Sequence, residues 1–386
     1  MEDPEKFKAR NRNYLRLFAL QLEKVYDAFH RFLAWATGRL GKPMVAEIYH
    51  ATPIAGGVAV KGRVLLARKS REPRPDDHPL VNLFQMMKRW ATPERPRSLV
   101  RATVGGTSME QIADGEGYFD IEIPTTDDKA DTLLIELPNS EASGPAEHSL
   151  YEVGKDYQCV IISDIDDTVL ITHAAKRLRM IATTLLGNAL TRQLFPGSPE
   201  LYRALRNGPD EEQDQANPIT YVTSSPFNLH SLLHLIFEEN DLPNGPFFMT
   251  DWGLDVDKWF SKSHGEHKIE AIETALEWFP EKPVILIGDS GQHDTMIYVD
   301  IALTHPHRVD QILIRDVTDP ERLSELQEKV DRIKEQGTRF SFFSDSAEAA
   351  EILAERGWIS SGQNRRVRDA VDNADPPLFH LGKIQT

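Results

Sequence analysis

The stretch from Cys159 to Thr172 reads CVIISDIDDTVLIT, and the rest of the chain is interpreted outward from it. Its apolar start, Val160–Ile162, suits a strand that is buried on both faces. Asp164, Asp166 and Asp167 follow within four residues. Carboxylates this close repel one another, so a fold tolerates them where a cation or ligand sits, as at the carboxyl end of a parallel strand. The alternative is an acidic surface turn.

The composition is that of a globular chain. Of its 386 residues, 40% are apolar and 27% charged, and no apolar run approaches the roughly 20 residues that span a bilayer. The formal net charge of −16 argues against nucleic-acid partners and against adsorption to anionic membranes. The charged start, MEDPEKFKARNRNY, lacks the apolar core of a signal peptide, and a single cysteine excludes an intrachain disulfide. We therefore expect a cytoplasmic protein.

Two regions precede the central stretch. Residues 1–42 carry apolar side chains at spacings of three and four, which predicts an amphipathic helix with a basic start. Its apolar stripe packs on the protein itself, on a second copy in an oligomer, or on a membrane surface. Residues 43–155 contain short strand-like runs between Gly, Pro, Asp and Ser clusters, which indicates a small β-sandwich. We expect this second domain to serve docking or support.

From residue 156 to 361, strand and helix patterns alternate, which predicts an α/β catalytic domain with a Rossmann-like parallel sheet. The expected strands are 159–163, 219–223, 246–250, 283–287, 311–315 and 339–343. The expected helices are 173–194, 228–239, 268–278, 294–302, 320–335 and 346–356. Residues 362–386 are polar and are expected to form a loose tail with a basic cluster at Arg365, Arg366 and Arg368.

Two further motifs carry side chains suited to holding a phosphoryl group. The segment ITYVTSSP, residues 219–226, reads as a strand that delivers Thr223 and Ser224 to its carboxyl end, where hydroxyls and backbone N–H groups can bind a phosphoryl oxygen. Lys268 opens a helix with an apolar face, and a cation at the same edge neutralises such a group. Each motif has an ordinary alternative, since hydroxyl residues end many strands and most lysines are solvated.

The fourth motif, VILIGDSGQHD, covers residues 284–294 and is a second apolar strand that ends in acidic residues, Asp289 and then Asp294. Its GDSG string also occurs around the nucleophile of chymotrypsin-like proteases. That assignment fails because Gln292 stands where Gly is expected, and because the chain alternates strands and helices. Asp289 is better interpreted as a metal ligand.

In this order the motifs resemble those of the haloacid dehalogenase superfamily of phosphotransferases: DxDxT, a strand-end Thr or Ser, Lys, and an acidic metal motif, over roughly residues 156–350. More narrowly, SDIDDT, YVTSSPFNL, LIGDSGQHD and ILIRDV resemble the phosphatidate phosphatase family typified by the fungal actin-patch protein, and the resemblance reaches into the β-rich region. It implies a haloacid dehalogenase-like domain and a phosphatase that acts on phosphatidate-like lipids.

The resemblance also implies roles for the motif residues. Asp164 is the expected nucleophile, which forms an aspartyl-phosphate, and Asp166 is the expected general acid and base. Mg²⁺ is the expected cofactor, bound by Asp164, the backbone carbonyl of Asp166 and Asp289, with Asp294 supporting the metal shell. Residues expected to bind the transferring phosphoryl group are Thr223, Ser224 and Lys268.

Two alternatives remain open from the sequence. The same chemistry suits a soluble phosphomonoester or a phosphoprotein, and a non-catalytic binding protein is disfavoured because the whole acidic set and Lys268 are intact. A lipid substrate requires peripheral contact with a membrane through a local basic patch, since the net charge repels an anionic surface. The candidate patches are the start of the N-terminal helix, Arg365–Arg368, and, in the insert after the first motif, Lys176, Arg177 and Arg179.

Overall fold

The structure is a computed structural model in which nine segments of the chain are described. They are residues 44–66, 95–127, 130–140, 144–170, 194–210, 215–250, 264–290, 294–316 and 321–374. The expected helix over 1–42 and, except for its last residue, the one over 173–194, with the basic residues at 176, 177 and 179, lie outside these segments. None of the helices in the described segments combines the length and apolar character of a membrane span.

The parallel sheet predicted from the sequence is confirmed, and it has six strands in the order β10-β9-β8-β11-β12-β13. All of its pairings are parallel. Its strands are β8 (Val160–Asp164), β9 (Ile219–Pro226), β10 (Phe247–Thr250), β11 (Val284–Asp289), β12 (Val309–Arg315) and β13 (Arg339–Phe343). The order reverses between β8 and β11, and in such sheets ligands bind beyond the carboxyl ends of the strands at this switch point.

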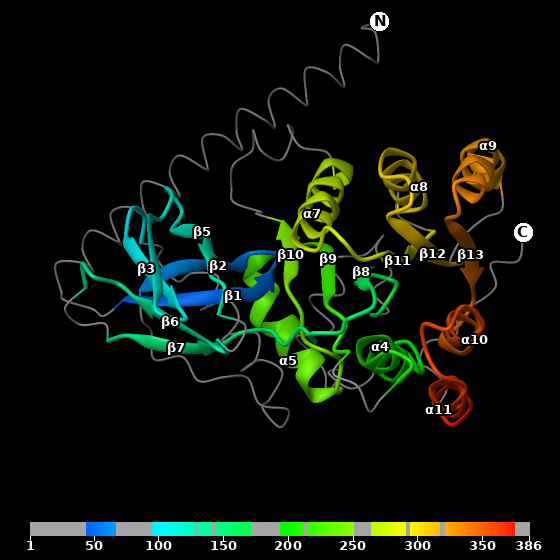
Figure 1. Cartoon of the computed structure of the whole chain (residues 1–386), viewed down its shortest axis with the longest axis horizontal. Coiled ribbons are helices and arrows are strands. Elements are labelled where there is room, and N and C mark those ends of the chain that lie inside the picture. Colours follow the sequence, from blue (N-terminus) through cyan, green and yellow to red (C-terminus); the bar gives the residue numbers. More distant parts are fainter. Residues whose placement is uncertain are drawn as a thin grey trace, which may run out of the picture.

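Helices cover both faces of the parallel sheet, as Figure 1 shows. One face carries α7 (His264–Trp278), α8 (Asp294–Thr304) and α9 (Glu321–Glu335). The other carries α4 (Ser198–Asn207), the short helix η3 (Phe227–Leu229), α5 (His230–Glu239), α10 (Ser346–Arg356) and α11 (Ser361–Asp372). Strand β8 alternates between two apolar cores: Val160 and Ile162 face α7 and α8, whereas Ile161 faces α4 and α5. Its near-continuous apolar run follows from burial on both faces.

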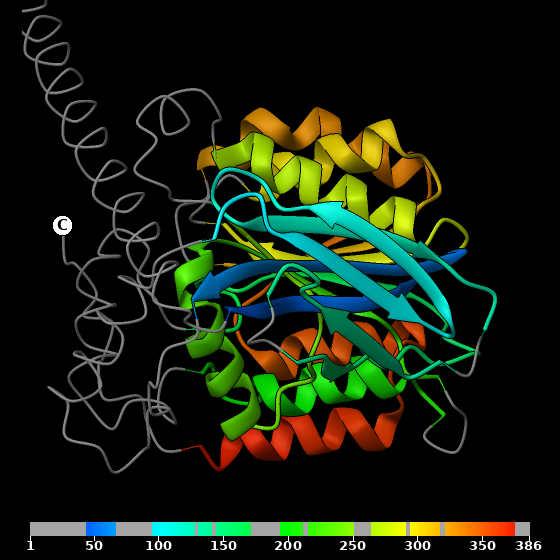
Figure 2. The same cartoon turned by 90° about the vertical axis from the view of Figure 1, so that its left-hand side faces the viewer.

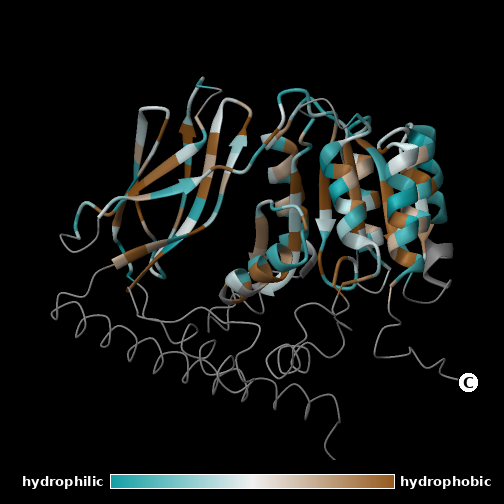
Figure 3. Ribbon diagram, turned by 90° about the horizontal axis from the view of Figure 1, so that it is seen from below, coloured by the Kyte–Doolittle hydropathy of each residue, from teal (hydrophilic) through white to brown (hydrophobic). Residues whose placement is uncertain are grey.

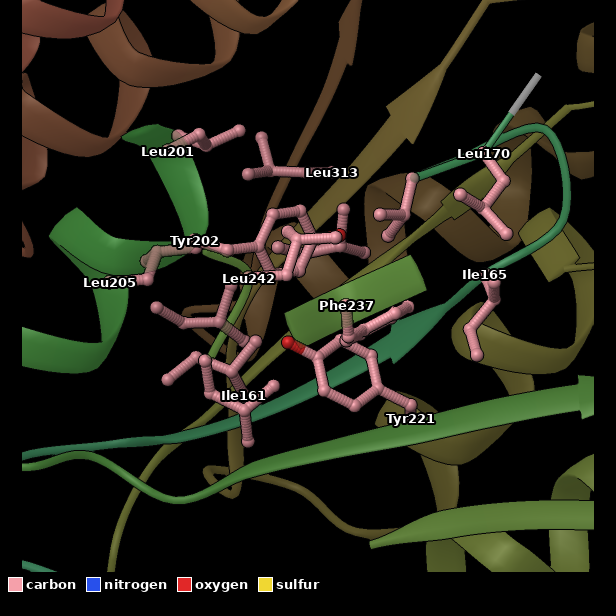
Figure 4. Packing of buried hydrophobic residues seen from close by; sticks show 14 of the residues in the cluster. Ile161, Ile165, Leu170, Leu201, Tyr202, Leu205, Tyr221, Phe237, Leu242 and Leu313 are labelled. Carbon is pink, nitrogen blue, oxygen red and sulfur yellow. The ribbon is translucent and has the colours of Figure 1, made fainter. Parts of the chain in front are cut away.

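The hydropathy of the elements agrees with these layers. In Figure 3 the strands are largely hydrophobic, and the helices present hydrophilic residues outward. Figure 4 shows the core on the α4 side, where Tyr202 and Leu205 of α4 meet Ile161 and Leu313 of the sheet.

Residues 44–149 contribute two antiparallel sheets, and side chains of both sheets form one common core. The first, β1-β2-β5, contains β1 (Met44–Ile54), β2 (Gly57–Leu66) and β5 (Tyr118–Pro124). The second, β4-β3-β6-β7, contains β4 (Thr107–Ile112), β3 (Leu99–Val104), β6 (Thr132–Glu136) and β7 (Ala146–Ser149). The sequence did not indicate β4 or β7, because both expose most of their residues and show no apolar alternation.

Strand β1 joins the antiparallel sheets to the α/β layer, and Figure 2 shows the antiparallel strands lying across that layer. Tyr49 stacks on Phe227 with ring centroids 4.7 Å apart, and His50 lies 5.2 Å from the ring of Trp278. The backbone N–H of Ala55 donates to the carbonyl of Trp278 at 2.9 Å. The contact is therefore both aromatic and hydrogen-bonded.

The expected loose tail from residue 362 is wrong for its first part, because Ser361–Asp372 forms α11. The helix begins with a capping box in which Ser360 and Gln363 bond to each other's backbone N–H. Gln363 also donates to the carbonyl of Gly208 at 2.8 Å, and Val367 is fully buried. With so few apolar residues, α11 gives little periodic signal, and contacts with the similarly missed α4 hold it.

Candidate active site

The site residues proposed from the sequence gather at the carboxyl edge of the parallel sheet. Asp164 and Asp289 are the last residues of β8 and β11, the two strands at the switch point. Thr223 and Ser224 lie near the end of β9, Lys268 lies in the first turns of α7, and Asp294 begins α8. All of these side chains are buried, as is that of Asp166 just after β8.

Three carboxylates form the centre of the site. One oxygen each from Asp164, Asp289 and Asp294 lies within 4.8 Å of the others, and all three residues are 0% exposed. The ammonium of Lys268 donates to Oδ1 of Asp164 at 2.7 Å and to Oδ1 of Asp294 at 2.5 Å. The structure thus brings Asp294 into the cluster itself, whereas the sequence analysis gave it a supporting place.

The electrostatics of the cluster follow from burial and pairing. Burial raises the pKa of Asp164 well above its usual value; Lys268 opposes this rise, while Asp294, Asp166 and Asp289 add to it. For Lys268, burial works against the charge, but Asp164 and Asp294 more than offset it and raise its pKa. The lysine therefore stays protonated, and its charge limits the rise in the pKa of Asp164.

The donor set fits a divalent cation. The three carboxylates and the ammonium of Lys268, which contacts Asp164 and Asp294, together carry a formal charge of −2 when all are ionised. Oδ2 of Asp294 is buried without a hydrogen-bond partner, a costly state that a cation would relieve. Oxygen donors of this kind suit Mg²⁺, which is usually bound through a few carboxylates and retained waters.

Gly288 allows this close packing. A Cβ at position 288 would lie 2.7 Å from Oδ2 of Asp294 and 2.8 Å from a ring carbon of Tyr298. Any side chain here would force Asp294 or Tyr298 to shift, so the glycine of the LIGDSG motif is a packing requirement.

Asp166 belongs to a separate hydrogen-bonded pair. The hydroxyl of Thr223 donates to Oδ2 of Asp166 at 2.7 Å and accepts from the backbone N–H of Ser225 at 3.0 Å. From the sequence, Thr223 was expected to bind the phosphoryl group. In this structure the Thr223 hydroxyl donates its proton to Asp166 and orients that carboxyl group. The carbonyl of Ser224 accepts from Thr250 at 2.9 Å.

Sequence reasoning missed three polar groups at this edge. Thr168, the threonine of DxDxT, lies 3.5 Å from Oδ2 of Asp164. Tyr202 of α4 hydrogen-bonds to Ser163, the residue before Asp164. Arg315, the last residue of β12, is 2% exposed and lies 3.9 Å from the ring centroid of Phe195; burial lowers its pKa to about 10. Thr168 was readable from the motif, whereas the other two depend on contacts between distant segments.

Comparison with known proteins agrees with this geometry. Residues 159–316, which hold the entire cluster, match the family described as "Phosphatidate phosphatase APP1, catalytic domain". This segment is thus similar to that family of catalytic domains. The phosphatidate phosphatase APP1 of Saccharomyces cerevisiae is 31% identical over 159 residues, which is 41% of this chain and 26% of the yeast protein. An uncharacterized protein of Schizosaccharomyces pombe is 28% identical over 209 residues, which is 52% of this chain and 33% of the S. pombe protein.

The extent of these matches is limited. The chain spans about a quarter to a third of the length of the curated relatives it matches. The resemblance to phosphatidate phosphatases is confirmed for the catalytic segment, and the family match begins after the β-rich region. Among solved structures, a carbohydrate acetylesterase from Xanthomonas citri aligns over 85% of this chain and 73% of its own with 10% identity and a TM-score of 0.33, too low to support an argument.

Proposed function

We propose that the chain is a Mg²⁺-dependent phosphatidate phosphatase of the haloacid dehalogenase type, which hydrolyses phosphatidate-like lipids to diacylglycerol and phosphate. The observation that carries this proposal is the buried cluster of Asp164, Asp289 and Asp294 around Lys268, inside the segment that matches the catalytic family. The name of the Saccharomyces cerevisiae relative, a phosphatidate phosphatase, supplies the substrate class.

In the first step, a carboxylate oxygen of Asp164 attacks the phosphorus, and the bond to the lipid oxygen breaks. The product is an aspartyl-phosphate on Asp164. This role requires an ionised carboxylate, and Lys268, at 2.7 Å, favours that form against the effect of burial. Asp164, the carbonyl of Asp166 and Asp289, with Asp294 beside them, would hold Mg²⁺, and the bound ion would supply positive charge for the phosphoryl oxygens.

Asp166 handles the protons. It gives a proton to the departing lipid oxygen and then takes one from the water that attacks the aspartyl-phosphate, which releases phosphate and restores Asp164. The hydrogen bond from Thr223 fixes one oxygen of Asp166 and therefore the direction of its carboxyl group. Asp166 shares the loop that follows β8 and is less deeply buried than Asp164, at 7% against 0% exposure.

The lipid part of the proposal has its own requirement. A chain of net charge −16 must meet an anionic surface through a local basic patch, and peripheral membrane contact is part of the proposal. The described cluster consists of carboxylates and one ammonium, which suit a phosphomonoester. None of these groups is specific for acyl chains. Substrate choice therefore has to be measured separately from chemistry.

The test is phosphate release by the full chain from a panel of substrates: phosphatidate in detergent micelles, soluble sugar phosphates, and a phosphopeptide. We expect phosphatidate to have the highest kcat/KM, with activity lost in excess chelator and restored by Mg²⁺. Preference for a sugar phosphate or the phosphopeptide would replace the lipid assignment with the soluble-substrate alternative. Undiminished activity in chelator would contradict the metal assignment, and no release from any substrate would contradict the enzyme assignment.

A further inference from the structure

One rung of the parallel sheet lies directly below the candidate active site. Ser163 of β8 and Ile287 of β11 are the last register partners between these two strands. Asp164 follows Ser163, and Asp289 comes two residues after Ile287. Both carboxylates therefore extend beyond the point where backbone pairing joins β8 to β11.

From one face of the sheet, Tyr202 of α4 contacts this rung. Its hydroxyl lies 2.5 Å from Oγ of Ser163, which in turn donates to the carbonyl oxygen of Asp164 at 2.7 Å. A serine hydroxyl has one proton, and that proton is used toward Asp164. Tyr202 must then be the donor, so a directed chain runs from its hydroxyl through Ser163 to the backbone of Asp164. Figure 4 shows Tyr202 extending from α4 into this core.

From the opposite face, Tyr298 of α8 contacts the same rung. Its hydroxyl donates to the carbonyl oxygen of Ile287 at 3.1 Å. Its ring lies against Gly288, where an added Cβ would come within 2.8 Å of it. Burial raises the pKa of both tyrosines, so both hydroxyls keep their protons and remain donors at neutral pH.

We propose that Tyr202 and Tyr298 are positioning residues that clamp the Ser163–Ile287 rung from its two faces and so fix the spacing between Asp164 and Asp289. Each hydroxyl acts through the backbone of the strand that carries the carboxylate. Misplacing a reacting group by about 1 Å can cost on the order of 100-fold in rate, so a rigid rung has a direct value here. The kinetic consequence rests on the proposed function, whereas the structural one does not.

A third tyrosine provides a matched control. Tyr221 of β9 is also fully buried in the core on the α4 side, and its hydroxyl also donates to a backbone carbonyl, that of Pro243, at 2.9 Å. Pro243 precedes β10, at the amino edge of the sheet, away from the carboxylates. Tyr221 is itself the β9 register partner of Ser163, and its ring lies 6.1 Å from that of Tyr202. Tyr221→Phe nevertheless removes only the hydroxyl and its bond to Pro243, so the hydrogen bonds that Tyr202 and Tyr298 make to the rung are kept.

The test compares Tyr202→Phe, Tyr298→Phe, the double variant, Ser163→Ala and Tyr221→Phe in the full chain. Amide hydrogen exchange is followed in peptides covering residues 160–166 and 284–290. Loss of one buried hydrogen bond, worth about 1 kcal/mol, is expected to raise local exchange about fivefold in Tyr202→Phe and in Tyr298→Phe, and at least as much in Ser163→Ala and the double variant. Tyr221→Phe should leave both peptides at the wild-type rate.

The kinetic arm uses a small chromogenic phosphomonoester, so that membrane contact plays no part. Tyr202→Phe and Tyr298→Phe should each lower kcat about tenfold, or 1.4 kcal/mol of barrier, with little change in KM. Because either substitution already releases the rung, the double variant should lose much less than the product of the two effects. Adding Ser163→Ala to Tyr202→Phe should lower kcat no further, since both substitutions interrupt the same chain of hydrogen bonds to Asp164.

Two results would overturn the clamp: exchange at both strand ends that matches Tyr221→Phe, or fully multiplicative losses of kcat in the double variant. If the wild-type chain releases no phosphate from any substrate, the proposed function fails on its own. Hydrogen exchange then still decides whether the two tyrosines hold the rung, because that measurement needs neither substrate nor metal.

Discussion

Two regions of this molecule bury titratable side chains, and they do so in opposite ways. At the carboxyl edge of the parallel sheet, Asp164, Asp289 and Asp294 form an acidic cluster whose negative charge exceeds that of its one ammonium, Lys268, and Oδ2 of Asp294 has no hydrogen-bond partner. Where β1 meets the α/β layer, burial lowers the pKa of His50 to about 3 and that of His230 to about 4, so both are neutral.

The difference lies in how complete each polar network is. His230 bonds to the carbonyl of Tyr49 at 3.0 Å, and Nδ1 of His50 lies 3.4 Å from the hydroxyl of Thr52. Neutral, partnered groups stabilise a packed interface and need nothing further. An anionic cluster with an unsatisfied oxygen is costly unless a cation binds, so it indicates a site. The predictions below test this distinction, from the largest effect to the smallest.

The nucleophile provides the largest effect. Asp164→Asn should lower turnover of any phosphomonoester by at least about 1000-fold, or some 4 kcal/mol of barrier, because an amide cannot form the acyl phosphate. The fold should persist, since the amide is neutral and similar in shape. Phosphate release and thermal unfolding are measured together. Asp300→Asn, an exposed change on α8, is the control, and activity within tenfold of wild type in Asp164→Asn would remove the nucleophile assignment.

The cation of the cluster comes second. Lys268→Met leaves three buried carboxylates without their ammonium, and breaking a buried pair in this way costs about 3–5 kcal/mol of unfolding free energy. The remaining carboxylates then favour protonation. A carboxyl group whose pKa is higher in the folded than in the unfolded state lowers the free energy of unfolding as the pH rises. The loss of stability in Lys268→Met should therefore be larger at pH 8 than at pH 5.

Urea unfolding at both pH values, with and without Mg²⁺, measures this effect. Lys329→Met removes an exposed ion pair with Asp300 and should change stability by no more than about 1 kcal/mol. If Lys268→Met and Lys329→Met behave alike, the cluster is not the strained anionic site described here. Restoration of stability by Mg²⁺ in Lys268→Met would sharpen the contrast with the histidine interface.

The histidine interface provides the third test, with the opposite dependence on pH. His50 and His230 have folded pKa values below the ordinary 6.5, so the folded state binds fewer protons than the unfolded state. Stability from this source is fully present above pH 6.5 and declines as pH falls toward the folded values of about 3 and 4. Each histidine contributes about 1.4 kcal/mol per pH unit in that window.

His50→Gln should therefore flatten the acid limb of the stability curve between about pH 6.5 and 4, while Asp120 and Lys61, the charged groups nearest this histidine, stay unchanged. Chemical unfolding at half-unit pH steps measures it. His148→Gln is the comparison, since His148 lies on β7, away from this interface; partial burial lowers the pKa of His148 as well, so we expect a smaller flattening there. An acid limb identical to wild type in His50→Gln would mean that the interface tolerates a charged histidine.

The sequence predicted the parts of this molecule that have a strong local signal. The six parallel strands are apolar runs, and their acidic or hydroxyl ends had to converge because carboxyl ends of parallel strands share one edge. The features that it missed depend on contacts between distant segments. Helix α11 is held by the hydrogen bond from Gln363 to Gly208 at the end of α4. Asp294 lies in the cluster because Gly288 leaves room for it, and Thr223 is paired with Asp166. None of these leaves a periodic pattern in the local sequence.

The smallest effect is expected where a polar pair is complete and far from both regions. At the start of α11, Ser360 accepts from the backbone N–H of Gln363 at 3.2 Å, and Gln363 accepts from that of Ser360 at 2.6 Å. Ser360→Ala removes one of these bonds, and losing such a cap costs about 1 kcal/mol. Gln363 stays held by the carbonyl of Gly208 at 2.8 Å, so the helix should remain docked on α4. Urea unfolding should show this modest loss with kcat and KM unchanged, because α4 contacts the site through Tyr202 and not through its carboxyl-terminal end. A tenfold fall in kcat would show that α11 controls the position of α4, and a complete polar network would then no longer be a mark of a purely structural region.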